Sequence, residues 1–116
     1  MANSFKTYRA LISSLRKTVP PAYPISVRRR KLNKKLEGRC WKHGKKFIIE
    51  IANNLDEARA IDVLLHEWAH ARAWNHMLDT ASTDELFNKL AHDAAWGVAY
   101  SEVYAAYERN FTAGVL

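Results

Sequence analysis

Apolar residues recur at helical spacing near the start of the chain, at Phe5, Tyr8, Leu11, Ile12 and Leu15. Residues three and four positions apart share one face of a helix, so this spacing predicts an amphipathic helix. Asn3 or Ser4 can cap its first turn, because their side-chain oxygens accept hydrogen bonds from free backbone N–H groups. Prolines at positions 20, 21 and 24 then end the helix and impose an extended connection.

The middle of the chain has the shorter periodicity of β-strands. Residues 25–27 begin a first strand, and residues 36–41 suggest a second. Residues 47–51 alternate between two faces in the manner of a half-buried strand. Before this last strand, Gly44 can adopt the positive φ that a tight turn requires. The pattern therefore predicts a small antiparallel sheet.

The longest helical pattern runs from residue 57 to about residue 77 and contains neither Gly nor Pro. Residues 53–56 precede it and supply side chains that cap helices. Its apolar stripe consists of Ile61, Leu64, Leu65 and Trp68. Such a stripe can bury one face of the helix and leave the opposite face for a cleft.

A second helical region follows a polar segment at residues 79–83. Residues 82–85 have the sequence of a capping box, and apolar positions continue from Leu86 towards Asn110. The order of elements predicts a single α+β domain over residues 1–116. This domain has an N-terminal helix, a small antiparallel sheet, a long helix, and a C-terminal helix or helix pair.

His66, Glu67 and His70 form an HExxH motif inside the long predicted helix. Two histidines four residues apart lie ~40° apart around the helix axis, so both imidazoles can reach one cation. The Glu67 side chain projects from the same turn at a different angle. That angle suits contact with a metal-bound water rather than with the metal itself. The motif predicts a Zn²⁺ site in which Glu67 is the general base for peptide-bond hydrolysis.

A catalytic zinc site usually has a third protein ligand, and three residues compete for that role. His92 lies four residues before Trp96 in an apolar segment, as is typical around a buried ligand. Glu102 could instead supply a carboxylate from the last helix. His76 has the spacing of the metzincin motif, but Ala73 stands where that motif needs Gly. We expect His92 to be the ligand, with Glu102 and His76 as alternatives.

Other polar side chains could support the same chemistry. Tyr100 or Tyr104 could donate a hydrogen bond to the oxyanion that forms during hydrolysis. Asp62 and Asp93 could accept hydrogen bonds from histidine ring N–H groups and so orient the ligands. The tyrosines also have an ordinary interpretation as part of an aromatic core, and Asp62 as an acid in the first turn of its helix.

The chain has a formal net charge of +6, and its basic residues concentrate before the long helix. The cluster consists of Arg28, Arg29, Arg30, Lys31, Lys34, Lys35, Arg39, Lys42, Lys45 and Lys46. A basic hairpin over residues 28–46 could bind a phosphate backbone without sequence preference. Alternatively, these charges only keep an exposed hairpin soluble.

Cys40 is the only cysteine, so an internal disulfide is excluded and a reducing compartment is indicated. We expect a partly buried strand thiol, with a fourth metal ligand as the alternative. The chain has no stretch of roughly 18 apolar residues that could span a membrane. Its start also lacks the apolar segment of a signal peptide. These features predict a cytoplasmic protein without a membrane partner.

The segment 64–71, together with His92 and Trp96, resembles the SprT-like zinc metalloproteases. It is also similar to small metallopeptidases of phages and bacteria, which carry an H-D-x-x-W-G-x-x-Y stretch. The resemblance covers roughly residues 47–107, and Asp93 departs from the glycine of the SprT-like pattern. It implies a zinc protease, in a bacterial or phage-infected cell, that could act on DNA-bound proteins.

A minimal zincin fold would also explain how a peptide is held. In such a fold, the edge strand before the metal helix can pair with an extended substrate, and residues 47–51 are the expected strand. The competing hypothesis is a protein without enzymatic activity. It would be a basic nucleic-acid-binding module, or a scaffold that zinc stabilises through the same histidines.

Overall fold

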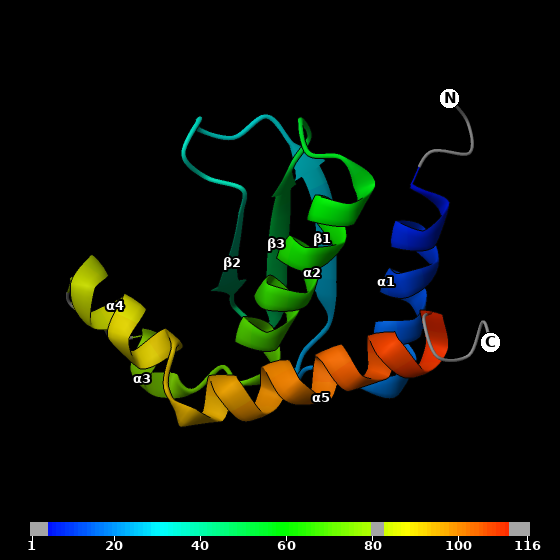
Figure 1. Cartoon of the computed structure of the whole chain (residues 1–116). Coiled ribbons are helices and arrows are strands. Elements are labelled where there is room, and N and C mark those ends of the chain that lie inside the picture. The colour runs from blue at the N-terminus through cyan, green and yellow to red at the C-terminus, as the bar shows by residue number, and fades with distance from the viewer. Residues whose placement is uncertain (1–4, 80–82, 112–116) are drawn as a thin grey trace.

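The computed structural model describes residues 5–79 and 83–111 (Figure 1). Its elements, in chain order, are α1 (Lys6–Thr18), β1 (Ile25–Arg30), β2 (Gly38–His43), β3 (Lys46–Ala52), α2 (Glu57–Arg72), α3 (His76–Asp79), α4 (Asp84–Ala91) and α5 (Ala94–Phe111). This order confirms the predicted α+β class, and α4 and α5 form the C-terminal helix pair. Asn3 and Ser4 lie outside the described residues, and the residue that precedes α1 is Phe5.

The three strands form a mixed sheet in the order β1-β3-β2. β2 pairs antiparallel with β3 across the predicted turn at Gly44, whose φ is 60°. β1 pairs with β3 in parallel, so the prediction of a purely antiparallel sheet is wrong. The segment between β1 and β2 carries the chain from one edge of the sheet to the other (Figure 1).

The prediction that residues 47–51 form the edge strand is also wrong, because β3 is the central strand. Every residue from Phe47 to Ala52 is buried, on both faces of the sheet. Burial on both faces is typical of a strand in the interior of a covered sheet. β2, which starts directly beside α2, is therefore one of the two edges of this sheet.

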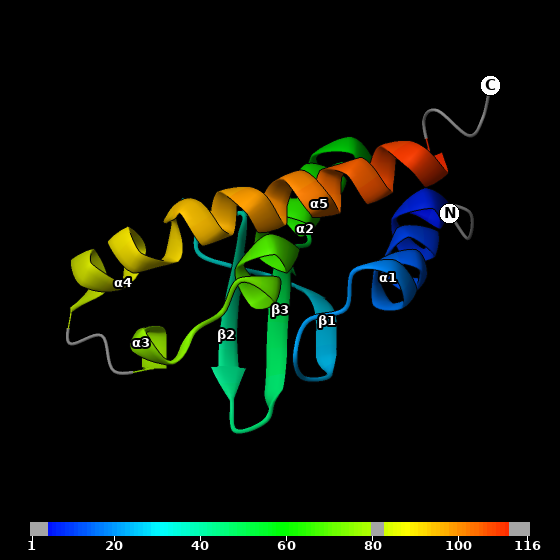
Figure 2. The same ribbon diagram turned by 90° about the horizontal axis from the view of Figure 1, so that it is seen from below.

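α2 and α5 lie on the same side of the sheet, and α1 packs beside them (Figures 1 and 2). The stripe predicted for the long helix forms the centre of the core. Leu64, Leu65 and Trp68 have no exposed surface, and Ile61 is 6% exposed. The indole Nε1 of Trp68 donates a 2.9 Å hydrogen bond to the backbone oxygen of Val19. This bond fixes α2 against the segment that follows α1.

The beginning of α2 agrees with the prediction, but its end does not. The Asp56 side chain caps the first turn by accepting a 2.9 Å hydrogen bond from the Arg59 backbone N–H. The helix ends at Arg72 instead of continuing to residue 77. Beyond it, the Trp74 ring packs against Phe47, with 5.8 Å between the ring centroids. The chain after Arg72 therefore contacts the sheet, and local helical propensity alone does not determine where α2 ends.

The basic cluster does not form one hairpin, because β1 and β2 lie on opposite sides of β3. Its side chains are consequently distributed over the whole sheet and the connection between its first two strands. Among the described residues, no helix is long and apolar enough to cross a lipid bilayer.

Candidate metal centre

Three histidines from two separate elements converge at one end of α2. His66 and His70 lie one turn apart on that helix, and their Nε2 atoms are 3.1 Å apart. His92 approaches them from the end of α4, with its ring centroid 4.6 Å from that of His70. One nitrogen from each ring lies within 4.8 Å of the other two. The HExxH pair and the expected third histidine are thus brought together.

Three histidine nitrogens form a donor set that suits zinc, among other transition metals. Tetrahedral Zn²⁺ with Zn–N bonds of ~2.0–2.1 Å places its ligand nitrogens about 3.3 Å apart, close to the His66–His70 separation. Metal ligation requires neutral imidazole, and burial is the largest cause that lowers the pKa of both helix histidines. For His70, burial and the neighbouring His66 and His92 lower the pKa to about 3. Protons therefore compete weakly for these two ligand atoms.

The end of α4 determines how His92 is presented. Thr83 caps the start of this helix by accepting a 3.1 Å hydrogen bond from the Leu86 N–H. At the other end, His92 leaves helical geometry, and its Nδ1 lies 3.0 Å from the Asn88 backbone oxygen. Because a carbonyl only accepts, Nδ1 carries the proton and Nε2 remains free for a metal.

A break between two helices separates His92 from Trp96, because α4 ends at Ala91 and α5 begins at Ala94. Asp93 starts α5, and its Oδ1 accepts a 3.1 Å hydrogen bond from the Trp96 N–H. Asp93 is therefore bonded as a helix cap, and the described contacts include no bond from it to a histidine ring. The cap redirects the chain so that His92 ends one helix while Trp96 begins the next.

Trp96 packs against the whole histidine cluster. Its ring centroid lies 5.0 Å from that of His66, 5.5 Å from His70 and 5.2 Å from His92. Its indole Nε1 also donates a 3.4 Å hydrogen bond to the His66 backbone oxygen. Such a large ring restricts the rotamers of all three histidines and excludes water from one side of the cluster.

The other sequence candidates are placed elsewhere. Glu102 forms an ion pair with Arg72, with 3.3 Å between Oε1 and Nε, and is outside the histidine cluster. The side chain of His76 lies outside the described residues, although its backbone begins α3. Cys40 is partly buried and does not join the cluster, and burial raises the pKa of its thiol. The expectation of a strand thiol is thereby confirmed.

Glu67 follows His66 in the chain, but its side chain is buried against the start of β2. The residue is only 8% exposed, and burial raises the pKa of its carboxyl group to about 7. Gly38, at the start of β2, packs closely above it, since a Cβ added to Gly38 would lie 3.4 Å from Glu67 Cγ. The Glu67 side chain therefore lies between α2 and the edge strand β2.

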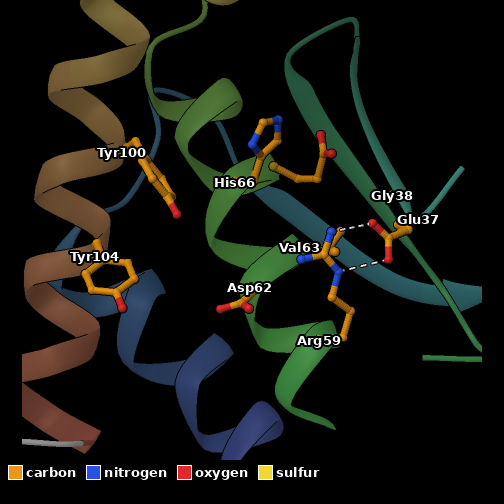
Figure 3. Close-up of a pocket in the computed structure, with 9 residues that line it drawn as sticks. Glu37, Gly38, Arg59, Asp62, Val63, His66, Tyr100 and Tyr104 are labelled. Carbon is orange, nitrogen blue, oxygen red and sulfur yellow. Dashed lines mark hydrogen bonds and ion pairs between the residues drawn. The ribbon is translucent and has the colours of Figure 1, made fainter. Parts of the chain in front are cut away.

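A cleft of about 450 Å³ begins at His66 and Glu67 and follows α2 towards its N-terminus (Figure 3). Asp62 and Arg59 continue the α2 wall, because positions three and four apart share one helix face. Tyr100 and Tyr104 of α5 form the opposite wall. The two tyrosines and Asp62, which the sequence suggested as supporting residues, thus line the cleft, and Tyr100 also packs against the core.

Four of the lining residues were not identified from the sequence, namely Glu37, Gly38, Arg59 and Val63. Glu37 and Gly38 reach the cleft from the start of β2, far from the HExxH motif along the chain. No local pattern marks them, since only the sheet topology brings them to α2. Arg59 could have been found, because it lies seven residues before His66 on the same helix face.

Replacing Gly38 by Ala is expected to lower the free energy of unfolding by about 1–3 kcal/mol. The added Cβ would lie 2.4 Å from Val63 Cγ1 and 3.3 Å from the Glu50 backbone oxygen, so the strand must move away from α2. Urea denaturation of the metal-free protein measures this change. Gly97→Ala is the matched control, because nothing lies within 4 Å of its new Cβ. Equal stabilities of the two variants would contradict the close contact at Gly38.

The chain matches no known family model, and comparisons with curated proteins and with solved structures also found no match. The function of the chain is therefore inferred from the arrangement of its own side chains.

Proposed function

We propose that this chain is a zinc-dependent metallopeptidase. The observation that supports this function best is the convergence of His66, His70 and His92, with nitrogens within 4.8 Å of one another. Glu67 lines the same cleft as His66. The three histidines would hold zinc with room for a further ligand, as in catalytic rather than structural sites. When bound, zinc supplies a Lewis acid that polarises a carbonyl and activates water near neutral pH.

Glu67 is the proton carrier of the reaction. A cation held by the neighbouring histidines favours the ionised form of Glu67, against the burial that raises its pKa to about 7. The carboxylate then accepts the proton of the attacking water and delivers it to the amine of the leaving fragment. Tyr100, which projects from α5 towards α2, provides a hydroxyl on the far side of the cleft (Figure 3).

The free edge of β2 gives a peptide substrate a place to bind. The Ala52 N–H donates to the Glu37 oxygen, so Glu37 directs its backbone groups towards β3. In an antiparallel pair, the backbone N–H and C=O groups of successive residues point alternately towards the partner strand and away from it. The backbone groups of Gly38, Cys40 and Lys42 therefore point away from β3. No other strand of the described structure pairs with this edge. An extended peptide can add here as a further strand, in the role that the sequence suggested for residues 47–51.

Removal of the metal provides the direct test. The purified protein should contain about one zinc per chain and cleave a mixture of unstructured peptides. A chelator should abolish cleavage, and stoichiometric zinc should restore it. Mass spectrometry of the peptide products measures both results. A zinc-loaded chain that cleaves none of the peptides would contradict the peptidase and leave the zinc-stabilised scaffold.

We also propose that the outer face of the sheet binds nucleic acid. No described helix covers this face (Figures 1 and 2). Arg28 and Arg39 flank Glu50 in register, and Arg30 lies 3.7 Å from its carboxylate. Three guanidinium groups around one carboxylate leave a positive surface. Trp41 adds an aromatic ring beside Arg39, which suits the stacked bases of a single strand.

Replacement of Arg28 and Arg30 by Ala should weaken binding of a single-stranded oligonucleotide. The slope of log K against log salt should decrease by about 1.4, since each lost phosphate contact contributes about 0.7. Fluorescence anisotropy over a range of salt concentrations measures it. A double variant at the exposed Lys17 and Lys89 has the same change in charge and should leave most of the slope intact. Equal slopes for the two double variants would contradict binding on the sheet face.

A further inference from the structure

The cleft beside the histidine cluster differs in charge from the rest of the molecule. The chain has a net charge of +6, yet the cleft contains the carboxylates of Glu37 and Asp62 against the single guanidinium of Arg59. The cleft is therefore an acidic depression in a basic protein, and its potential favours cations.

Two of the charged groups in the cleft, Arg59 and Glu37, are paired with each other. Arg59 donates from both Nε and NH2 to the two oxygens of Glu37, which is the bidentate pairing drawn in Figure 3. Such a pair satisfies the guanidinium and the carboxylate together. The exposed Asp62 carboxylate has no hydrogen bond or ion pair among the described residues. Asp62 is thus the carboxylate of the cleft without a hydrogen-bonded partner, and the charge of Arg59 acts on it only at longer range.

Aromatic rings complete the surroundings of Asp62. Tyr100 and Tyr104 stand opposite it on α5, with 6.0 Å between their ring centroids (Figure 3). Tyr104 is 39% exposed, so its ring is accessible from the cleft. A carboxylate facing aromatic rings is an arrangement that attracts ammonium and guanidinium groups.

We propose that this cleft is a specificity pocket for a lysine or arginine side chain of the substrate. Asp62 lies one helical turn before His66, a separation of about 6 Å along α2. The four-carbon stem of a lysine beside the scissile bond can span such a distance. Its ammonium group then reaches Asp62 and packs against Tyr104, while the stem lies along Val63. This assignment rests on the proposed peptidase, because it places the substrate backbone at the histidine cluster.

Peptide hydroxamates test the pocket without depending on hydrolysis, because a hydroxamate group binds catalytic zinc directly. Three side chains are compared: lysine, norleucine with the same stem but no charge, and glutamate. Two series place the variable side chain on the amino or the carboxyl side of the hydroxamate. Titration calorimetry with the zinc-loaded protein should give about tenfold tighter binding for lysine than for norleucine in one series. Glutamate should bind more weakly than norleucine.

Asp62→Asn should remove most of the preference for lysine and leave the affinity for the norleucine compound unchanged. Glu85→Gln, an equal change of charge at an exposed position of α4, should preserve the preference. Equal binding of lysine and norleucine in both series, or an unaltered preference in Asp62→Asn, would overturn the pocket. A chain that prefers the lysine hydroxamate yet cleaves no peptide would refute the peptidase and retain the pocket. A chain that takes up no zinc would overturn both proposals.

Discussion

Glu67→Gln is expected to lower the rate of peptide cleavage by about 10²–10⁴-fold, the contribution of general acid–base catalysis. Glutamine has the shape of glutamate and fits the space between α2 and β2, but its amide cannot accept the proton of the attacking water. The three histidines are unaltered, so zinc should bind as before. A buried carboxyl group is also lost, and the variant should be at least as stable as the parent chain.

Three measurements on the same sample make this test decisive. Zinc content, thermal unfolding and kcat with a fluorogenic peptide should show that the catalytic rate alone has decreased. Glu85→Gln is the matched control on the exposed surface of α4 and should retain full activity. Unchanged cleavage by Glu67→Gln would refute the general base. Loss of zinc would instead make Glu67 part of the ligand sphere.

The local part of the fold was predictable because local periodicity reports which face of an element is buried. The apolar stripe of α2 and the cap at Asp56 depend only on neighbouring residues, and both are confirmed. The position of β3 was not predictable in this way. Glu50 gave the strand a half-polar pattern, which is typical of an edge. Its carboxylate is nevertheless buried, because Arg39 and Arg30 cover it.

The same distinction between local and long-range features applies to the residues of the candidate site. The spacing of His66 and His70 is a property of one helix, so the HExxH pair could be located from the sequence alone. The position of His92 depends on the break between α4 and α5, where the Asp93 cap turns the chain. Gly38 depends on a still more distant feature, the path of β2 beside α2. Residues that the tertiary topology brings to the site from distant parts of the chain have no periodic pattern in the sequence that marks them.

His92→Ala is expected to weaken zinc binding by more than about 100-fold, since loss of a direct ligand exceeds the 10–100-fold effect of losing an outer-shell partner. Two histidines on one helix still bind the ion, but they leave two tetrahedral positions to water. Competition with a chromophoric chelator measures the affinity, and circular dichroism checks that α4 and α5 remain folded.

Glu102→Ala is the matched control, because it removes the other candidate ligand from the sequence. Glu102 is paired with Arg72 on α2, so this variant should keep the zinc affinity of the parent chain. The reverse result, with zinc lost from Glu102→Ala and retained by His92→Ala, would refute the three-histidine centre. His76→Ala completes the comparison. If only this variant loses zinc, the third ligand follows the metzincin spacing, and the contact between His92 and His70 is packing alone.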